Sequence, residues 1–316
     1  KEIPETACMK IAHNALFSFL LLMASVVSFG QIKQKETELK DITGLWEVSA
    51  TIGANNFLCD LGGNLGIGKP FLKGYIFKTV KPLFGVSATY NLNAWISFSG
   101  GFSFSNIDGA DSLINNEGGM ERWRYNRNLS FHSFVYEGYG TFDFYPMTFF
   151  DRTTGIYQVA PFLSGGIGVL HFNPKTMLNG EEIELAPLHL EGQGFPEYTQ
   201  RKPYSLVQFY IPLAIGVKYF VNNKYAVSAG IRIRQTFTDY MDDISTTYID
   251  PSLFDKYLTP EEAILAKQLY SRSLQPWKVK PNIEKAHIKD KDGYVDVFLT
   301  FSMRIGSNTL FKVGVF

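Results

Sequence analysis

The stretch "YSLVQFYIPLAIGVKYF", residues 204–220, alternates between two kinds of side chain along most of its length. Every second residue from Val207 to Tyr219 is bulky and apolar, whereas the residues between them form a mixed set with small, polar and charged members. Alternation at this period indicates a β-strand, because successive side chains point to opposite faces of the backbone. The stretch is about three times longer than a common strand of five or six residues. It therefore predicts something other than an ordinary soluble sheet.

Seven further segments share this alternation, so the chain is predicted to contain eight strands. They are residues 45–52, 84–90, 96–104, 134–144, 159–172, 225–237 and 294–305. The connections between them alternate between long and short, as in an outer-membrane barrel with short periplasmic turns and longer external loops. In hydrocarbon every backbone group must be paired internally, so a β-structure has to close on itself. The sequence predicts an all-β fold, an eight-stranded antiparallel transmembrane β-barrel.

The apolar set is predicted to face lipid and the mixed set to face the interior. A soluble lipocalin-like barrel is the structural alternative, and it would turn its apolar residues inward. The mixed set contains residues of both charges: Glu137, Asp143, Lys218, Arg232, Arg234, Asp296 and Arg304. Side chains fill the interior of an eight-stranded barrel, so these residues predict a structural charge network in the lumen. A proton or ion path is the alternative.

The amino-terminal region has the features of a signal peptide at residues 9–30, with Lys10 before an apolar stretch and small residues at its end. The sequence thus predicts export through a cleaved signal peptide to the outer membrane of a Gram-negative bacterium. Residues 1–8 are interpreted as an upstream extension or artefact. Residues 31–44 are predicted to be periplasmic, 45–305 to form the barrel and 306–316 to be a tail. A mature chain with Cys59 alone excludes an intrachain disulfide.

The 316-residue chain has a formal net charge of +0. This balance implies no bulk attraction to nucleic acid. One helix is predicted in the longest loop, with Thr259 as its N-cap, Pro260 in the first helical position and Glu261 and Glu262 in the first turn. Its apolar stripe would comprise Ala263, Ile264, Ala266, Leu269 and Tyr270. That stripe is expected either to pack against the protein itself or to contact a partner.

Catalytic motifs such as GxSxG, HExxH and CxxC do not occur in the sequence. His132 and Ser133 offer only the start of a hydrolase constellation, which would also need an orienting acid. A metal site could use His171, His189 and Glu191, and a calcium site could use Asp239, Asp242 and Asp243. Neither set has an established ligand spacing. The prediction is therefore no enzymatic activity, no cofactor and no metal.

Four loop stretches are specific in sequence: "RNLSF" (127–131), "GGIGVLHFNPK" (165–175), "PLHLEGQG" (187–194) and "TFTDYMDDISTTY" (236–248). With "NNFLCDLGG" (55–63), they make the chain resemble the PorG-like family of outer-membrane β-barrels, one of which is a component of the type IX secretion system. The motif residues are Arg127, Asn128, Asn173, Pro174, Glu191, Gly192, Gln193, Gly194, Asp239, Tyr240, Asp242 and Asp243.

The resemblance implies a non-catalytic barrel in outer-membrane lipid that associates with periplasmic secretion-ring proteins. Contacts with such a ring would be expected at residues 31–44 and 146–158. The helical insert in residues 250–292 departs from the family pattern. The alternative function is a surface-binding barrel, an adhesin or ligand receptor, that uses its long external loops. A membrane-embedded hydrolase is the third hypothesis.

Overall fold

The computed structural model describes residues 42–58, 61, 79–114, 120–151, 158–276, 279–285 and 291–305. The predicted signal peptide, Cys59 and the tail at 306–316 lie outside the described residues, as does most of the predicted periplasmic segment 31–44.

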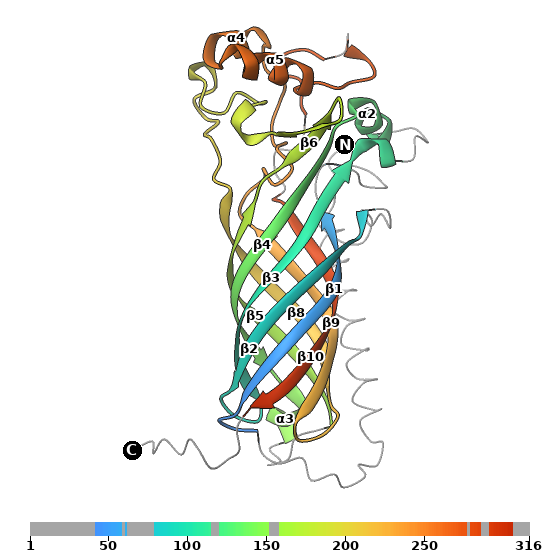
Figure 1. The fold of residues 1–316 in the computed structure, drawn as a ribbon, viewed down its shortest axis with the longest axis vertical. Helices are drawn as coiled ribbons and strands as arrows, with labels where there is room; N and C mark the ends of the chain where they lie inside the picture. The colour runs from blue at the N-terminus through green and yellow to red at the C-terminus, as the bar shows by residue number, and fades with distance from the viewer. Residues whose placement is uncertain are drawn as a thin grey trace, which may run out of the picture.

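Ten strands form one antiparallel sheet, and eight of them close into a barrel (Figure 1). Around the barrel these are β3 (Ile96–Ala110), β2 (Lys81–Asn91), β1 (Trp46–Leu58), β10 (Gly293–Ile305), β9 (Tyr225–Thr236), β8 (Val207–Phe220), β5 (Val159–Phe172) and β4 (Ser130–Phe144). Pairing of β3 with β4 completes the circle. The remaining strands, β6 (Lys175–Leu178) and β7 (Glu181–Glu184), form a hairpin that continues from β4. The predicted fold and all eight predicted strands are confirmed.

Along most of the barrel wall the alternating apolar side chains point outward. On β8, Val207, Phe209 and Leu213 are 51, 59 and 54% exposed, whereas Tyr210 and Lys218 are 1 and 5% exposed. A lipocalin-like barrel would show the opposite pattern, so that alternative is excluded. An outward apolar wall is what a closed barrel needs in order to contact acyl chains. None of the helices in the described ranges has both the length and the hydropathy required to cross a bilayer.

Short connections lie at one end of the barrel and long connections at the other (Figure 1). The short-turn end, which is the periplasmic end, carries a cluster of aromatic residues around helix α3 (Pro146–Asp151). The ring of Phe149 lies 5.0 Å from that of Trp95 and 5.2 Å from that of Phe150. Aromatic side chains favour the membrane–water interface, so this cluster marks the inner boundary of the membrane-spanning wall.

The long connections form an external cap, defined here as residues 111–114, 120–129, 173–206, 237–276 and 279–285. Besides the β6–β7 hairpin it contains short helical elements, and Figure 1 shows them at one end of the molecule. They are η2 (Asp111–Leu113), α2 (Met120–Arg127), η3 (Ala186–Leu188), η4 (Pro196–Tyr198), α4 (Ser252–Tyr257) and α5 (Pro260–Leu269). The sequence interpretation expected one helix here, so the other elements are an addition to it.

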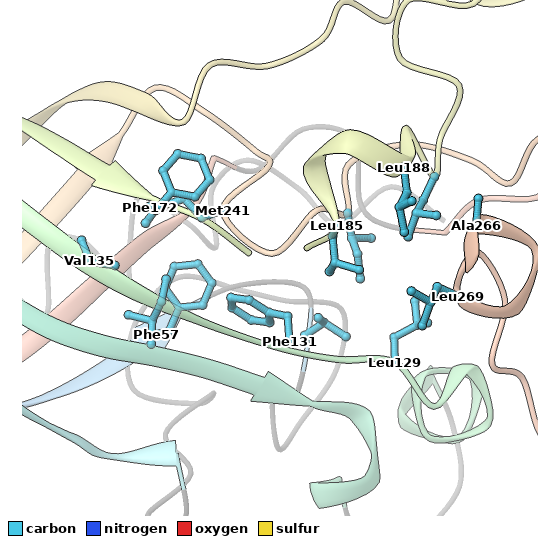
Figure 2. Close-up of a cluster of buried hydrophobic side chains, with 14 of the residues drawn as sticks. Phe57, Leu129, Phe131, Val135, Phe172, Leu185, Leu188, Met241, Ala266 and Leu269 are labelled. Atoms are coloured by element: carbon cyan, nitrogen blue, oxygen red, sulfur yellow. The ribbon is translucent and has the colours of Figure 1, made fainter. Parts of the chain in front are cut away.

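One hydrophobic core runs from the mouth of the barrel into the external cap. Phe57, Phe131, Val135 and Phe172 point inward from barrel strands and join cap residues in the same cluster. Figure 2 shows them beside Leu129, Leu185, Leu188, Met241, Ala266 and Leu269. The inner face of the barrel is therefore apolar at its external mouth, which the predicted mixed inner face did not include.

The predicted helix in the longest loop is confirmed as α5. The Thr259 hydroxyl accepts a hydrogen bond from the backbone N–H of Glu262, and the Glu262 carboxylate accepts one from the backbone N–H of Thr259. This capping box satisfies two donors that the first turn of a helix leaves unpaired. Ala263, Ala266 and Leu269 are buried in the core, whereas Ile264 is exposed. The helix thus packs against its own chain.

The Thr259→Ala variant is expected to lose about 1 kcal/mol of local stability, because one helix donor loses its acceptor. Backbone amides of α5 should then exchange with deuterium several-fold faster, while those of the barrel strands stay unchanged. Hydrogen exchange followed by mass spectrometry measures both. Thr199→Ala, at an exposed position, serves as the control, and equal effects of the two variants would contradict the capping role.

Candidate functional site

A fully buried ion cluster lies in the lumen toward the external end. Arg234 of β9 is placed between Glu137 of β4 and Asp296 of β10. Its Nε lies 2.6 Å from Glu137 Oε1, and its Nη1 donates to Asp296 Oδ1. The Tyr294 hydroxyl also donates to Glu137, and the Arg234 guanidinium lies 4.8 Å from the centre of the Tyr294 ring. The cluster joins strands on opposite sides of the barrel.

A second ion cluster lies toward the periplasmic end. Lys218 of β8 is 2.5 Å from Glu47 Oε2, and Arg304 of β10 is 3.1 Å from Glu47 Oε1. Glu47, on β1, is the residue of this cluster that the sequence prediction did not include. The signal was present, because Glu47, Ser49 and Thr51 alternate with Val48, Ala50 and Ile52 in the weakest predicted strand.

A polar cavity of ≈ 90 Å³ separates the two clusters. Its lining is rich in hydroxyl groups, including Ser49 and Thr300, and Asp143 and Arg232 also contribute. Asp143 accepts a hydrogen bond of 3.0 Å from the Ser99 hydroxyl, whereas the Arg232 guanidinium lies 4.6 Å from the centre of the Phe298 ring. The cavity can hold a small number of waters. The seven predicted luminal residues thus occupy two clusters and this cavity, rather than one network.

In the external cap, the "EGQG" turn directs one carboxylate into the interior. Gly192 and Gly194 adopt positive φ angles of +74° and +83°, and a Cβ on Gly192 would lie 2.7 Å from the Tyr198 ring. Only glycine fits such a position without strain. The Gln193 side-chain carbonyl accepts a hydrogen bond from the backbone N–H of Glu191 and fixes the turn. The result is a Glu191 side chain that is fully buried.

Glu191 organises the loop between β9 and β10. Its carboxylate accepts hydrogen bonds from the Thr246 backbone N–H at 2.8 Å, from the Thr246 hydroxyl at 2.7 Å and from the Ser245 backbone N–H. The ammonium of Lys285, also buried, lies 3.5 Å away. Arg201 donates to the carbonyl groups of Glu191 and Thr247. These contacts join two loops that are remote in sequence.

The first motif stretch is fixed by a buried ion pair. Arg127 donates two hydrogen bonds, of 2.7 and 2.8 Å, to the Asp111 carboxylate and one to the Lys285 carbonyl. Bidentate pairs of this kind are among the strongest that side chains make. Asn128 adopts a left-handed conformation, with φ 57, and its side chain donates to the Arg272 carbonyl. RNLSF thereby connects the β3–β4 loop to the β9–β10 loop.

The other motif residues also have local partners. Asn173 donates to Ser133 Oγ from its backbone and to Glu184 from its side chain, and the Pro174 carbonyl accepts from the Leu185 backbone N–H. Asp239 accepts from the Ser245 hydroxyl, and Asp242 from the Ile244 backbone N–H. Most of the second stretch lies in strand β5 and not in a loop. All four stretches contribute to the same hydrophobic cluster, through Leu129, Phe172, Leu190 and Met241, and hydrogen bonds join the third stretch to the fourth.

Asp243 is a buried carboxyl group in a left-handed backbone position, with φ 62. It accepts a hydrogen bond of 2.7 Å from the Tyr204 hydroxyl, and the Tyr204 ring stacks on that of Tyr240 with centroids 4.8 Å apart. Burial raises the pKa of Asp243 to about 7, although the Lys285 charge and the Tyr204 hydroxyl act in the opposite direction. The neutral form is therefore the one that folding favours.

Because the folded-state pKa of Asp243 exceeds its unfolded value of about 3.9, unfolding releases a proton between about pH 4 and pH 7. The stability contributed by the protonated group is complete below pH 4, is lost as the pH rises to 7 and stays low above it. We expect the cap to resist proteolysis less at pH 8 than at pH 5. Asp243→Asn, which tolerates the same backbone conformation, should abolish this difference when cleavage is normalised to an unfolded substrate at each pH. A pH dependence unchanged in Asp243→Asn would contradict the assignment.

The residues considered for a catalytic or a metal site are not brought together into one. His132 and Ser133 are neighbours on β4 and point to opposite faces; His132 binds Glu182 at 2.7 Å, while the Ser133 hydroxyl donates to the Phe134 carbonyl. His171 is exposed on β5, and Glu191 is occupied by backbone donors. Within the described ranges, no group of three or more His, Cys, Asp and Glu residues is arranged to hold a metal ion.

Several solved outer-membrane proteins are similar to this chain in structure. The attachment invasion locus protein Ail of Yersinia pestis matches with a TM-score of 0.38 at 9% identity, covering 83% of this chain and 99% of that chain. OprG from Pseudomonas aeruginosa matches with a TM-score of 0.35 at 10% identity, covering 84% of this chain and 97% of that chain. Neither a family model nor a curated protein matches the chain. Similarities this low carry no argument about function, and the PorG-like relationship stays a prediction.

Proposed function

We propose that this protein is a non-catalytic outer-membrane barrel that anchors or organises a protein-secretion assembly of the type IX kind. The observation that supports a scaffold over a conduit is the filled interior. Two ion clusters occupy the lumen, and a hydrophobic core continues from the barrel mouth into the cap. A structure of this kind gives a rigid wall and two end surfaces on which other proteins can assemble.

The type IX association itself comes from the sequence resemblance, which implies contacts at the periplasmic end. At that end α3 presents Phe150, which is 76% exposed. This residue offers an apolar contact for a secretion-ring protein, although its neighbourhood also suits the lipid interface. The other predicted contact segment, 31–44, lies almost wholly outside the described residues.

A photo-crosslinking amino acid at position 150, introduced in the native envelope, tests this proposal. The same group at Ile264 on the external cap, where the side chain is 58% exposed, is the matched control. We expect secretion-ring proteins to be captured from position 150 and not from position 264. Capture of lipid alone, together with normal secretion by a strain that lacks the protein, would exclude the anchoring function.

A second candidate function is binding at the outer surface by the cap. One observation favours it: a cleft of ≈ 390 Å³ between α2 and residues 273–276 and 279–283.

A further inference from the structure

The cleft between α2 and the β9–β10 loop is lined in part by polar side chains that lack partners among the described residues. By contrast, Glu191, Arg201 and Asp111 of the cap are each held by several partners. In the cleft, the side chains of Arg122, Asn126 and Gln275 form no hydrogen bond or ion pair with any other described residue. Three polar side chains whose donors have no partner in the described ranges therefore line one concave surface.

The cleft is nevertheless a fixed feature of the cap. The backbone N–H of Leu274 donates to the Asn126 carbonyl at 2.8 Å and holds residues 273–276 against α2. The hydroxyl of Ser273 accepts from the backbone N–H of Gln275 at 3.1 Å and sets the direction of that segment. Arg127, in the cleft floor, is fixed by Asp111. The polar side chains of the cleft are thus attached to backbone that hydrogen bonds hold in place.

Trp123 supplies a flat apolar surface in the same cleft. Its side chain is 39% exposed, and it lies 5.4 Å from the Arg127 guanidinium in a cation–π arrangement. A half-exposed aromatic ring surrounded by amide and guanidinium donors suits a ligand with an apolar face and a hydroxylated edge. A sugar ring has both, because its C–H groups gather on one face and its hydroxyl groups lie around the rim.

The charged side chains among the described lining residues of the cleft are two arginines, Arg122 and Arg127. The Arg127 charge is balanced by Asp111 through two hydrogen bonds, whereas Arg122 is exposed and forms no ion pair with a described residue. Among the described residues that line the cleft, the Arg122 guanidinium has no counter-charge, which favours a carboxylate, sulfate or phosphate on the ligand. The volume of ≈ 390 Å³ falls in the range of small-molecule sites, about 300–1,000 Å³.

We propose that this cleft binds an oligosaccharide that carries an acidic group, with one sugar ring against Trp123 and the acidic group on Arg122. Asn126 and Gln275 donate hydrogen bonds to the ring hydroxyl groups. This site goes beyond the anchoring function and exists whether or not a secretion assembly binds at the opposite end of the barrel.

The folded full chain in lipid nanodiscs, applied to an array of neutral, sialylated, uronate-bearing and sulfated oligosaccharides, tests this inference. We expect retention on acidic members and at least tenfold weaker retention on their neutral parents. Trp123→Ala should lower affinity at least tenfold for every bound sugar, because the stacking surface is lost. Arg122→Gln should reduce affinity for the acidic sugars to that of their neutral parents. Lys202→Gln, which removes an exposed charge elsewhere on the cap, should change nothing.

Each other outcome overturns the proposal. Retention of no acidic sugar excludes the site, and retention that Trp123→Ala leaves intact places the ligand elsewhere. An acidic preference that persists in Arg122→Gln removes the assigned charge contact. Retention of acidic peptides in place of sugars assigns the cleft to a different class of ligand. Arg122→Gln alters an exposed side chain and should fold, so the test remains decisive if Trp123→Ala does not.

Discussion

Replacing Arg234 by methionine is expected to lower the free energy of unfolding of the barrel by about 3 to 5 kcal/mol. The guanidinium is fully buried between Glu137 and Asp296. Methionine fills much of the same volume but leaves two carboxylates without their counter-charge in the lumen. Removing one member of a buried ion cluster costs more than the pair contributes, because the remaining charges have lost the water that solvated them in the unfolded chain.

Equilibrium unfolding in denaturant, with the protein reconstituted in phospholipid vesicles, measures this loss. Arg232→Met is the matched control, because Arg232 lies two residues away on β9 and packs against Phe298 without an ion pair to a described residue. We expect Arg232→Met to cost about 1 kcal/mol or less. In the Arg234→Met background, Glu137→Gln combined with Asp296→Asn should recover part of the stability. Equal costs for the two arginines would show that charge compensation is not the cause.

The second large effect is expected for Glu191→Ala in the external cap. This change leaves the buried ammonium of Lys285 without its carboxylate and removes the acceptor of the backbone N–H groups of Ser245 and Thr246. The local free energy of opening should fall by about 3 kcal/mol. That corresponds to an increase of about 100-fold in the open population that a protease can cut, since 1.4 kcal/mol is about tenfold.

Limited proteolysis with mass-spectrometric mapping of the cut sites tests this expectation. Cleavage should appear within residues 237–285, while the unfolding midpoint of the barrel stays within its error. Glu184→Ala is the control, since this exposed carboxylate lies 3.6 Å from Lys175 at the surface and such pairs contribute little. If Glu184→Ala and Glu191→Ala open the cap equally, the buried carboxylate is not its organising contact.

The barrel wall could be predicted from the sequence because its signal is local and repeated. The predicted bounds of 159–172 coincide with β5, and the outward set of β8 is the apolar set of the opening stretch. The predicted ends of a strand differ from the structure where the alternation of side chains is interrupted. β1 was predicted to end at residue 52 but extends to Leu58, because Asn55 and Asn56 interrupt the alternation.

The apolar lining of the external mouth could not be predicted from the alternation of side chains. Phe131 points into the core while Phe134, on the same strand, is exposed. When both faces carry aromatic residues, alternation no longer distinguishes the inside from the outside. The β6–β7 hairpin was missed although its signal was present, since Asn179 and Gly180 form the Asn-Gly pair typical of a two-residue turn.

The cap was the least predictable part, because its contacts join distant segments. Arg127 binds a carbonyl 158 residues away, and Glu191 binds Thr246 across 55 residues. No local periodicity records such pairings. The motif stretches did indicate which residues matter there, and the capping signals of α5 were local enough to be correct.

The shared core of mouth and cap has a consequence for biogenesis. Leu129, Leu188 and Ala266 come from three different connections, and each needs the other two in order to be shielded from water. No single connection can therefore collapse by itself while it is still being threaded outward. The apolar segments are therefore expected to stay unstructured, and accessible to holdase chaperones, until β1 and β10, the first and last strands of the chain, pair and close the wall. Folding of the external cap is then the final step of assembly. If the barrel fails to close, these apolar segments stay exposed and prone to aggregate.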